Sequence, residues 1–194
     1  MQFKLCELVK NGFKFGCQIC GNCCKGKKKG YIFTYKPDLE KLFEYFKCTT
    51  EAEKHEFAKK HLEIISQKFV YKDNNTDVKK NYYYDTLVFK LVGENEECCF
   101  LGENNMCKIY SVRPFQCISY PVWRIILTIK KNWDENLKKC KGINIINGEF
   151  YSQKKILDIL KKEFQLEKNF FLEMKAHNFK IKEVYSFLRN INKD

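Results

Sequence analysis

The sequence has few of the residues on which familiar catalytic and nucleotide-binding motifs depend. Only three of its 194 residues are histidine. His55 and His61 are six positions apart on an expected helix, so they cannot share one face as the two zinc ligands of an HExxH motif do. Neither GxGxxG nor GxxxxGK[ST] occurs, so no familiar phosphate-binding loop is predicted.

Long hydrophobic runs are also missing. The longest apolar stretches, such as 122–129, are far shorter than the roughly 20 residues of a membrane-spanning helix, and Arg124 interrupts that one. Lys4, Glu7 and Lys10 break up any apolar segment near the N-terminus, so we expect no signal peptide. The sequence therefore predicts no membrane span and a reducing compartment, the cytoplasm.

Arginine is scarce although the net charge is +12, because only three of the 36 basic residues are arginine. Specific reading of nucleic acids usually depends on arginine or on a known docking module, and neither is evident. We therefore expect no nucleic-acid partner beyond nonspecific electrostatic binding. The basic run 25–29 has a second use, because ammonium groups there would offset the negative charge of neighbouring thiolates.

Cysteine is abundant, with eleven in the chain. Four of them fall within the eight residues Cys17-Gln18-Ile19-Cys20-Gly21-Asn22-Cys23-Cys24. A CxxC turn lets two sulfurs face one point, and thiolates are the ligands preferred by zinc, copper(I) and iron–sulfur clusters. Two such turns overlap here, and one mononuclear ion is not expected to take all four sulfurs. The run therefore predicts a metal-binding function.

A second group of cysteines follows much later, at Cys98, Cys99, Cys107, Cys117 and Cys140. Cys6 and Cys48 stand alone, and we interpret both as small hydrophobic residues. Prolines at 114 and 121 stiffen the segment that carries Cys117. Arg113 is a candidate to donate hydrogen bonds to sulfur or to a carbonyl near a metal centre. The alternative interpretation is that it forms an ion pair with an acidic residue at the surface.

These segments together resemble a known family. The run from Phe15 to Cys24, Cys98 with Phe100-Leu101, the stretch 107–114, and Cys117 with Tyr120-Pro121 are similar to the CxxCxxCC cysteine-cluster family, which is described as zinc- or iron-chelating. The resemblance spans about residues 13 to 142. It implies eight metal ligands, which are Cys17, Cys20, Cys23, Cys24, Cys98, Cys107, Cys117 and Cys140.

Two positions depart from the family pattern. Cys99 stands where the family usually has proline, and Ile118 stands where a basic residue commonly follows the cysteine. Neither departure removes a ligand. The first leaves open whether Cys98 or Cys99 carries the ligand role, and the resemblance favours Cys98.

The resemblance implies a metal-binding protein that chelates zinc or iron, the latter also as an iron–sulfur cluster. Eight sulfurs suffice for two four-ligand sites, one shared polynuclear site, or one site with structural cysteines. An iron–sulfur-dependent enzyme is an alternative, because the flagellin lysine N-methylase is similar to the family in its cysteine cluster, although no cofactor motif for methyl transfer is evident. A disulfide-stabilised structural protein is a second alternative and needs an oxidising compartment.

The expected fold class is α+β, with a small irregular cysteine-rich metal-binding core, short strands, flanking helices and a C-terminal helical extension. We expect a metal-binding domain over residues 1–150 and a helical extension over 151–194 packed on the same domain. The amphipathic helices there would secondarily offer a surface to a protein partner. The periodicity and turn residues predict strands at 30–35, 82–92 and 122–130, helices at 37–46, 50–66, from 152 and at 181–188, and a loop or hairpin connection at 66–81.

Overall fold

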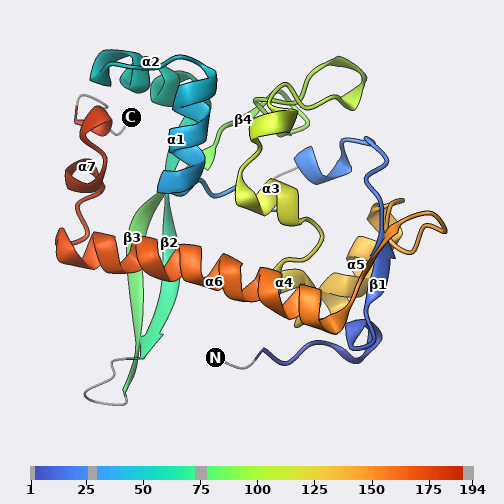
Figure 1. Ribbon diagram of the computed structural model, residues 1–194. Helices are drawn as coiled ribbons and strands as arrows, with labels where there is room; N and C mark the ends of the chain where they lie inside the picture. The colour runs from blue at the N-terminus through green and yellow to red at the C-terminus, as the bar shows by residue number, and fades with distance from the viewer. Residues whose placement is uncertain (1–2, 26–29, 73–77, 190–194) are drawn as a thin grey trace. The chain divides into compact units, whose positions relative to one another are not determined.

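The computed structural model describes residues 3–25, 30–72 and 78–189. The chain divides into two compact units, and each unit is assembled from two separate stretches: Met1–Gly30 with Leu91–Leu166, and Tyr31–Lys90 with Glu167–Asp194. The fold class is α+β, as predicted, with helices and short antiparallel strand pairs (Figure 1). A domain boundary between residues 150 and 151 stays a prediction.

The first unit holds the cysteine-rich part of the chain. Its elements are β1 (Phe13–Phe15), β4 (Leu91–Val92), β5 (Glu97–Cys98), α3 (Phe115–Ser119), α4 (Arg124–Leu127), α5 (Lys130–Lys139), β6 (Glu149–Tyr151) and the first part of α6 (Gln153–Ala176). β1 pairs with β6 and β4 pairs with β5, both antiparallel. The strands are short, so much of this unit is irregular backbone, as expected for a cysteine-rich core.

Aromatic packing fixes the segment that leads into the cysteine run. Phe13 is buried between two rings, with its centroid 4.9 Å from that of Trp133 on α5 and 5.7 Å from that of Tyr151 on β6. Trp133 is itself 1% exposed. Burying such large side chains is worth about 1.5–3 kcal/mol each. The backbone just before Cys17 is therefore held by two elements that come more than a hundred residues later.

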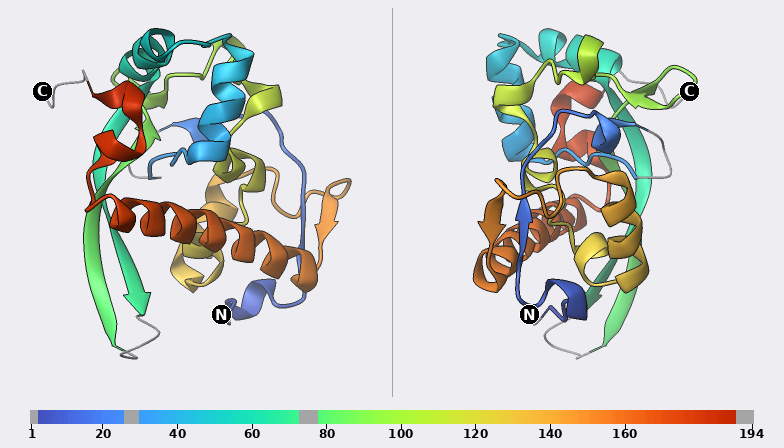
Figure 2. Two further views of the ribbon diagram at one scale, coloured as in Figure 1. Left: turned by 60° about the vertical axis from the view of Figure 1, so that its left-hand side comes forward. Right: turned by 90° about the vertical axis from the view of Figure 1, so that its right-hand side faces the viewer.

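The second unit contains the longer secondary structure. Its elements are α1 (Lys36–Tyr45), α2 (Glu51–His61), β2 (Leu62–Lys72), β3 (Lys79–Phe89), the last part of α6 and α7 (Ile181–Val184). β2 and β3 form an antiparallel ribbon whose register runs from the pair Leu62 and Phe89 to the pair Lys72 and Lys79. Figure 2 shows the twist of this ribbon.

One face of the ribbon carries the core of the second unit. Phe171, in the C-terminal part of α6, is fully buried. Its ring centroid lies 4.7 Å from that of Phe69 and 5.0 Å from that of Tyr71, both on β2, and 5.1 Å from that of Tyr82 on β3. β3 alternates between buried and more exposed residues over 82–86, the period-2 pattern of a half-buried strand, and then ends in four buried residues, 86–89.

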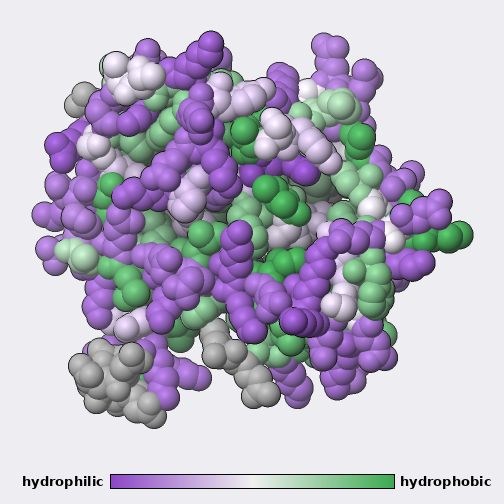
Figure 3. All heavy atoms as spheres, in the orientation of Figure 1, coloured by the Kyte–Doolittle hydropathy of each residue, from purple (hydrophilic) through white to green (hydrophobic). Residues whose placement is uncertain are grey.

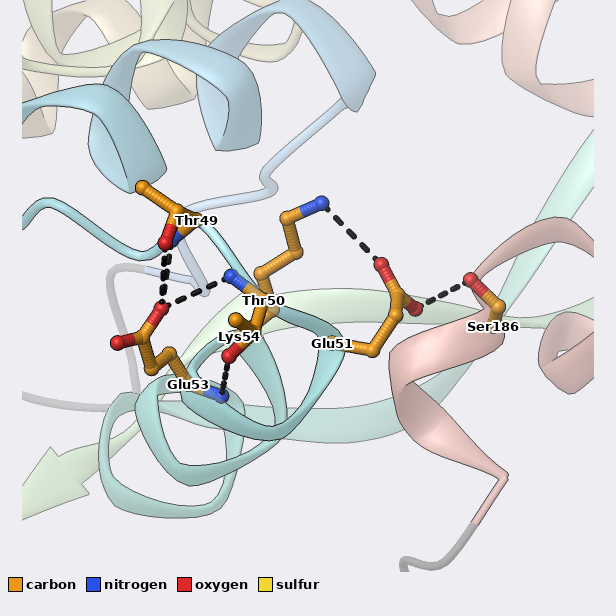
Figure 4. A network of polar contacts seen from close by, with 6 residues as sticks. All are labelled: Thr49, Thr50, Glu51, Glu53, Lys54 and Ser186. Carbon is orange, nitrogen blue, oxygen red and sulfur yellow. Dashed lines mark hydrogen bonds and ion pairs between the residues drawn. The ribbon is translucent and has the colours of Figure 1, made fainter.

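α2 begins with the capping box that the sequence predicts (Figure 4). The Glu53 amide donates to Thr50 Oγ1 over 3.2 Å, and the Thr50 amide donates back to the Glu53 carboxylate over 2.8 Å. The Thr49 amide donates to the same carboxylate over 2.7 Å. These hydrogen bonds lower the pKa of Glu53 to about 2, with the Thr50 amide as the largest cause.

The end of this helix differs from the prediction. The expected helix 50–66 stops at His61, and Leu62 already begins β2. The expected connection 66–81 is mostly strand, since β2 continues to Lys72 and β3 begins at Lys79. The turn expected at 73–75 lies outside the described residues. Pairing with β3 supplies the backbone hydrogen bonds that make strand the better state for this β-branched stretch.

Two predicted strands are also wrong. Residues 30–35 contribute only an isolated bridge, in which Phe33 faces Val88. Residues 122–130 contain the short helix α4 (Arg124–Leu127) and the first residue of α5 in place of the predicted strand, because a short apolar run does not distinguish a buried helix from a buried strand. The predicted helices at 37–46 and from 152 are confirmed as α1 and α6, and 181–188 is helical in two short pieces.

Hydrophilic side chains cover much of the face drawn in Figure 3, with hydrophobic residues in scattered groups among them. Within the described residues, no helix has both the length and the apolar character needed to cross a bilayer. This agrees with the expectation from the sequence.

Candidate metal centre

The run from Cys17 to Cys24 reverses direction at its middle. Ile19 and Gly21 both have positive φ, at 49° and 70°. The Cys24 amide then donates to the Gly21 carbonyl over 2.9 Å and closes a short 3-10 turn. Gly21 is required for a second reason, since a Cβ there would come 2.8 Å from Asn105 Oδ1. The turn is therefore seated against the loop that precedes Cys107.

The beginning of this run lies beside the segment that follows Cys140. The Gly16 amide donates to the Gly142 carbonyl over 3.0 Å, and Phe15 forms an antiparallel bridge with Ile143. Asn22, further along the run, donates from Nδ2 to the Lys139 carbonyl over 2.9 Å. The run is thus attached on both sides of Cys140, which is itself buried.

The end of the run lies beside Cys98. Lys25 forms an antiparallel bridge with Glu97, and their side chains make an ion pair of 3.3 Å. The sulfurs of Cys23 and Cys24 are 3.8 Å apart. The other lysines of the predicted basic run, at 27–29, lie outside the described residues. The ammonium group of Lys25 is therefore engaged with a carboxylate.

Cys98 and Cys107 bracket one loop, as the sequence predicts. Leu101 bridges Cys107, and the Lys108 amide donates to the Phe100 carbonyl over 2.9 Å. The Gly102 amide donates to the Met106 carbonyl over 2.7 Å and tightens the turn. The loop therefore returns the chain to the neighbourhood of Cys98 before Cys107.

Cys117 lies on α3, the short helix that directly follows Pro114. Its amide donates to the Pro114 carbonyl over 3.0 Å. Burial is the main reason that the pKa of the Cys117 thiol is raised well above its usual range. Negative charge on Cys98, Cys23 or Cys107 raises this pKa further, whereas the Arg113 guanidinium lowers it. All four thiols therefore lie within electrostatic range of one another.

Arg113 is held in place by Tyr110. Its Nε donates to the Tyr110 carbonyl over 3.1 Å, and the guanidinium carbon lies 3.7 Å from the centroid of the Tyr110 ring. The guanidinium also lowers the pKa of Cys107, although burial raises that pKa overall. This favours the role beside thiols that the sequence suggested for Arg113.

Cys140 has a different neighbour, the hydroxyl group of Tyr120. Burial raises the pKa of Cys140, the Gly142 amide and the Tyr120 hydroxyl lower it by hydrogen bonding, and charge on Cys20 raises it. In the structure the single proton of the Tyr120 hydroxyl is donated to Asn136 Oδ1 over 3.0 Å. The sequence does not predict this contact of Tyr120 with Cys140. The only signal in the sequence is the position of Tyr120 between Cys117 and Pro121.

Cys98 and its neighbour Cys99 are in contact. The Cys99 side chain hydrogen bonds to Cys98, which is the largest cause of the raised pKa of Cys98, and burial is the second. Cys98 is buried and Cys99 is partly exposed. The choice between these two adjacent thiols as the ligand stays a prediction in favour of Cys98.

All eight predicted ligands belong to the first unit, and all eleven cysteines lie in the described part of the chain without forming a disulfide. Backbone contacts bring the run 17–24 next to the segments that carry Cys98 and Cys140, and bring Cys107 back toward Cys98. The side chain of Cys17, by contrast, is exposed. As the side chains stand, residues 3–25, 30–72 and 78–189 contain no group of three or more His, Cys, Asp or Glu arranged to hold a metal ion. The donor set itself, sulfur with no histidine, fits zinc or iron.

Comparison with known families agrees with the donor set. Residues 16–141 match the model of the CxxCxxCC family, whose description is "Putative zinc- or iron-chelating domain". The chain belongs to this family. No solved structure matches it. As a member of the CxxCxxCC family, the chain carries all its matched cysteines between β1 and Cys140, the residue that follows α5.

Proposed function

We propose that this protein binds zinc or iron through the thiolates of eight cysteines, Cys17, Cys20, Cys23, Cys24, Cys98, Cys107, Cys117 and Cys140. The observation that carries the proposal is the attachment of one cysteine run to two distant cysteine segments. Gly16 pairs with Gly142, and Lys25 pairs with Glu97. These contacts bring cysteine-bearing segments that are far apart in the sequence next to one another.

Binding requires the thiol side chains to turn toward a common point. The run 17–24 is already adjacent to the segments of Cys98 and Cys140, so we expect side-chain rotamer changes to contribute to this convergence. Each thiol gives up its proton when it binds a metal, so the raised pKa values of Cys98, Cys117 and Cys140 make binding weaker as pH falls. Iron would be held as an iron–sulfur cluster, since four cysteines are the usual ligands of such clusters.

The compartment follows from the same chemistry. Thiols must stay reduced to bind metal, so we propose that the protein functions in the cytoplasm. Lysine is distributed along the whole chain, so any nucleic-acid binding would be nonspecific. The metal ion is the main partner that we propose. A protein partner that binds to the amphipathic C-terminal helices is a secondary proposal.

The test is replacement of one ligand and of matched cysteines that are not ligands. Cys20→Ser should lower the metal content of anaerobically purified protein. Cys6→Ser, in the same unit, and Cys48→Ser, in the other unit, should leave it unchanged. Equal metal content in Cys20→Ser and the controls would contradict the proposal, and so would metal loss in the Cys48→Ser variant alone.

A cavity of about 160 Å³ favours a second candidate function, an iron–sulfur-dependent enzyme. It is lined by Cys23, Tyr120, Trp123 and Asn136, among others. A structural metal site is closed, whereas a catalytic site needs access for another molecule. If this access is used, a small anionic ligand such as cyanide should change the visible spectrum of the anaerobically purified, iron-containing protein, and an unchanged spectrum would remove the support for an enzyme.

A further inference from the structure

The ribbon of β2 and β3 has a second face, opposite the one that packs on α6 (Figure 1). Side chains alternate between the two faces of a strand, and residues that pair directly across two strands share a face. Phe69 and its partner Tyr82 face Phe171 on α6. The second face therefore carries the other set of pairs, which is Ser66 with Asp85, Lys68 with Tyr83, Val70 with Asn81, and Lys72 with Lys79. We call these residues the outer face.

Most of the outer face is open to solvent. Tyr83 is 68% exposed and Val70 is 50% exposed, and all three lysines are exposed as well. The Lys68 ammonium group lies 6.0 Å from the centroid of the Tyr83 ring. Because an aromatic ring stabilises a fold mainly by being buried, the second unit gains little from a tyrosine at this position. The ring of Tyr83 is therefore accessible to a partner.

The outer face is positively charged. Its three lysines are accompanied by one acidic residue, Asp85. Within the described residues, neither Lys68 nor Lys79 makes an ion pair. Lys72 lies directly opposite Lys79, and like charges in this arrangement destabilise a strand pair. A bound anion would offset that repulsion.

The spacing of the lysines indicates an extended anion. Lys68 and Lys72 are separated by about 13–14 Å along β2, at the usual rise of a strand. A single phosphate or carboxylate group cannot reach both ammonium groups at once, whereas a chain of phosphates can. Tyr83 lies opposite Lys68, so the outer face combines a line of positive charge with an exposed ring.

We propose that the outer face binds single-stranded nucleic acid without sequence preference, with its three lysines beside phosphates and the Tyr83 ring stacked on a base. Proteins that bind single strands in this way combine basic residues along the backbone with aromatic rings on which bases stack. In a duplex the bases are already stacked on one another, so Tyr83 would find no free base. The outer face also has no arginine to read base edges in the major groove. This function goes beyond metal binding and does not depend on it.

Fluorescence anisotropy with a labelled oligothymidine of about 16 nucleotides tests the proposal on the full chain under reductant. Tyr83→Ala should weaken binding about fivefold or more, the loss of one stacked base. Tyr83→Phe should keep most of the affinity, because the ring remains. Tyr45→Ala is the matched control, since Tyr45 lies on α1 of the same unit and is 48% exposed. No binding by the wild type, or equal losses in Tyr83→Ala and Tyr45→Ala, would overturn the proposal.

The salt dependence of binding tests the lysines. Lys68→Gln and Lys79→Gln should each reduce the slope of log affinity against log salt by about 0.7, the change for one lost phosphate contact with a single strand. Lys60→Gln removes an exposed lysine of α2 in the same unit and should leave the slope unchanged. An equal change in Lys60→Gln would show that the charge of the whole chain attracts the oligonucleotide, and would overturn the proposal.

Two other anionic partners provide the remaining comparison. Tyr83→Ala should not weaken binding to a DNA duplex of the same length, and an equal loss for duplex and single strand would overturn the proposal. Vesicles of anionic phospholipid that bind through Tyr83, while the oligothymidine does not bind, would overturn it as well. The ribbon variants should keep the metal content of the wild type, because all eight predicted metal ligands lie in the first unit and the ribbon lies in the second. A failure to bind the oligothymidine is thus separate from a failure to bind metal.

Discussion

Gly142 lies directly against Gly16. The Gly16 amide donates to the Gly142 carbonyl over 3.0 Å, and a Cβ on Gly142 would overlap the Gly16 carbonyl oxygen. This contact joins the entrance of the cysteine run to the segment after Cys140. It is backbone against backbone, so neither side can yield by changing a rotamer.

Gly142→Ala should therefore destabilise the fold by about 1–3 kcal/mol, the usual cost of forcing extra atoms into a packed place. It should also lower metal content, because it moves the backbone beside Cys140. Urea unfolding and elemental analysis check both effects.

Gly16→Ala is the matched control for that change. A Cβ on Gly16 would meet Ile145 Cγ2 at 3.4 Å, an ordinary contact. The Gly16 amide would keep its hydrogen bond. Equal unfolding midpoints for the two variants would show that the close approach at Gly142 is unimportant.

Cys98→Ser and Cys99→Ser should separate the two adjacent thiols. Cys98 is buried and directly follows Glu97, the residue that bridges Lys25. Its loss should therefore reduce metal content strongly. Cys99 hydrogen bonds to Cys98, and its loss should lower the affinity for metal by about 10- to 100-fold while the metal site remains, as the loss of a residue that hydrogen bonds to a ligand commonly does. Competition with a chromogenic chelator measures both. The opposite ranking would assign the ligand role to Cys99.

Glu53 should give the second unit an acid-dependent stability. Its pKa is lowered to about 2 by hydrogen bonds from the Thr50 and Thr49 amides. The ionised carboxylate is thus favoured in the folded state, so its contribution is present above the unfolded pKa and is lost as pH falls toward 2. Unfolding midpoints measured from pH 6 to pH 2 should fall less steeply in Glu53→Gln than in the wild type. Parallel curves would mean that the capping box does not couple to folding.

Phe171 should be the most costly single truncation in the second unit. Its ring is fully buried among Phe69, Tyr71 and Tyr82, so Phe171→Ala should cost about 3–5 kcal/mol. Leu172, the next residue, is 39% exposed. Leu172→Ala should cost about 0.5 kcal/mol or less, as surface changes do. Comparable losses in urea unfolding would show that the ribbon does not pack on α6 as described.

Local signals in the sequence were sufficient for the helices with explicit caps. Thr50 and Glu53 marked the start of α2, and Ser152 marked the start of α6, where the Lys155 amide donates to its hydroxyl over 3.3 Å. The end of α2 could not be predicted in the same way. Residues from Leu62 onward become a strand because they pair with β3, a partner that comes later in the chain.

The candidate site shows the same division between local and distant information. Spacing and family resemblance identified which cysteines belong together as a set. They could not show that Gly16 meets Gly142 or that Lys25 meets Glu97, because those contacts join residues far apart in the chain.

Elemental analysis with acid-labile sulfide, on untagged protein purified without oxygen, tests the central claim most directly. The account predicts bound zinc, or iron with matching sulfide, that is lost when Cys20 is replaced by serine. Colourless protein with zinc would favour a structural centre, and brown protein with iron and sulfide would favour an iron–sulfur centre. Protein that contains neither metal, and that binds neither when it is offered under reducing conditions, would contradict the account.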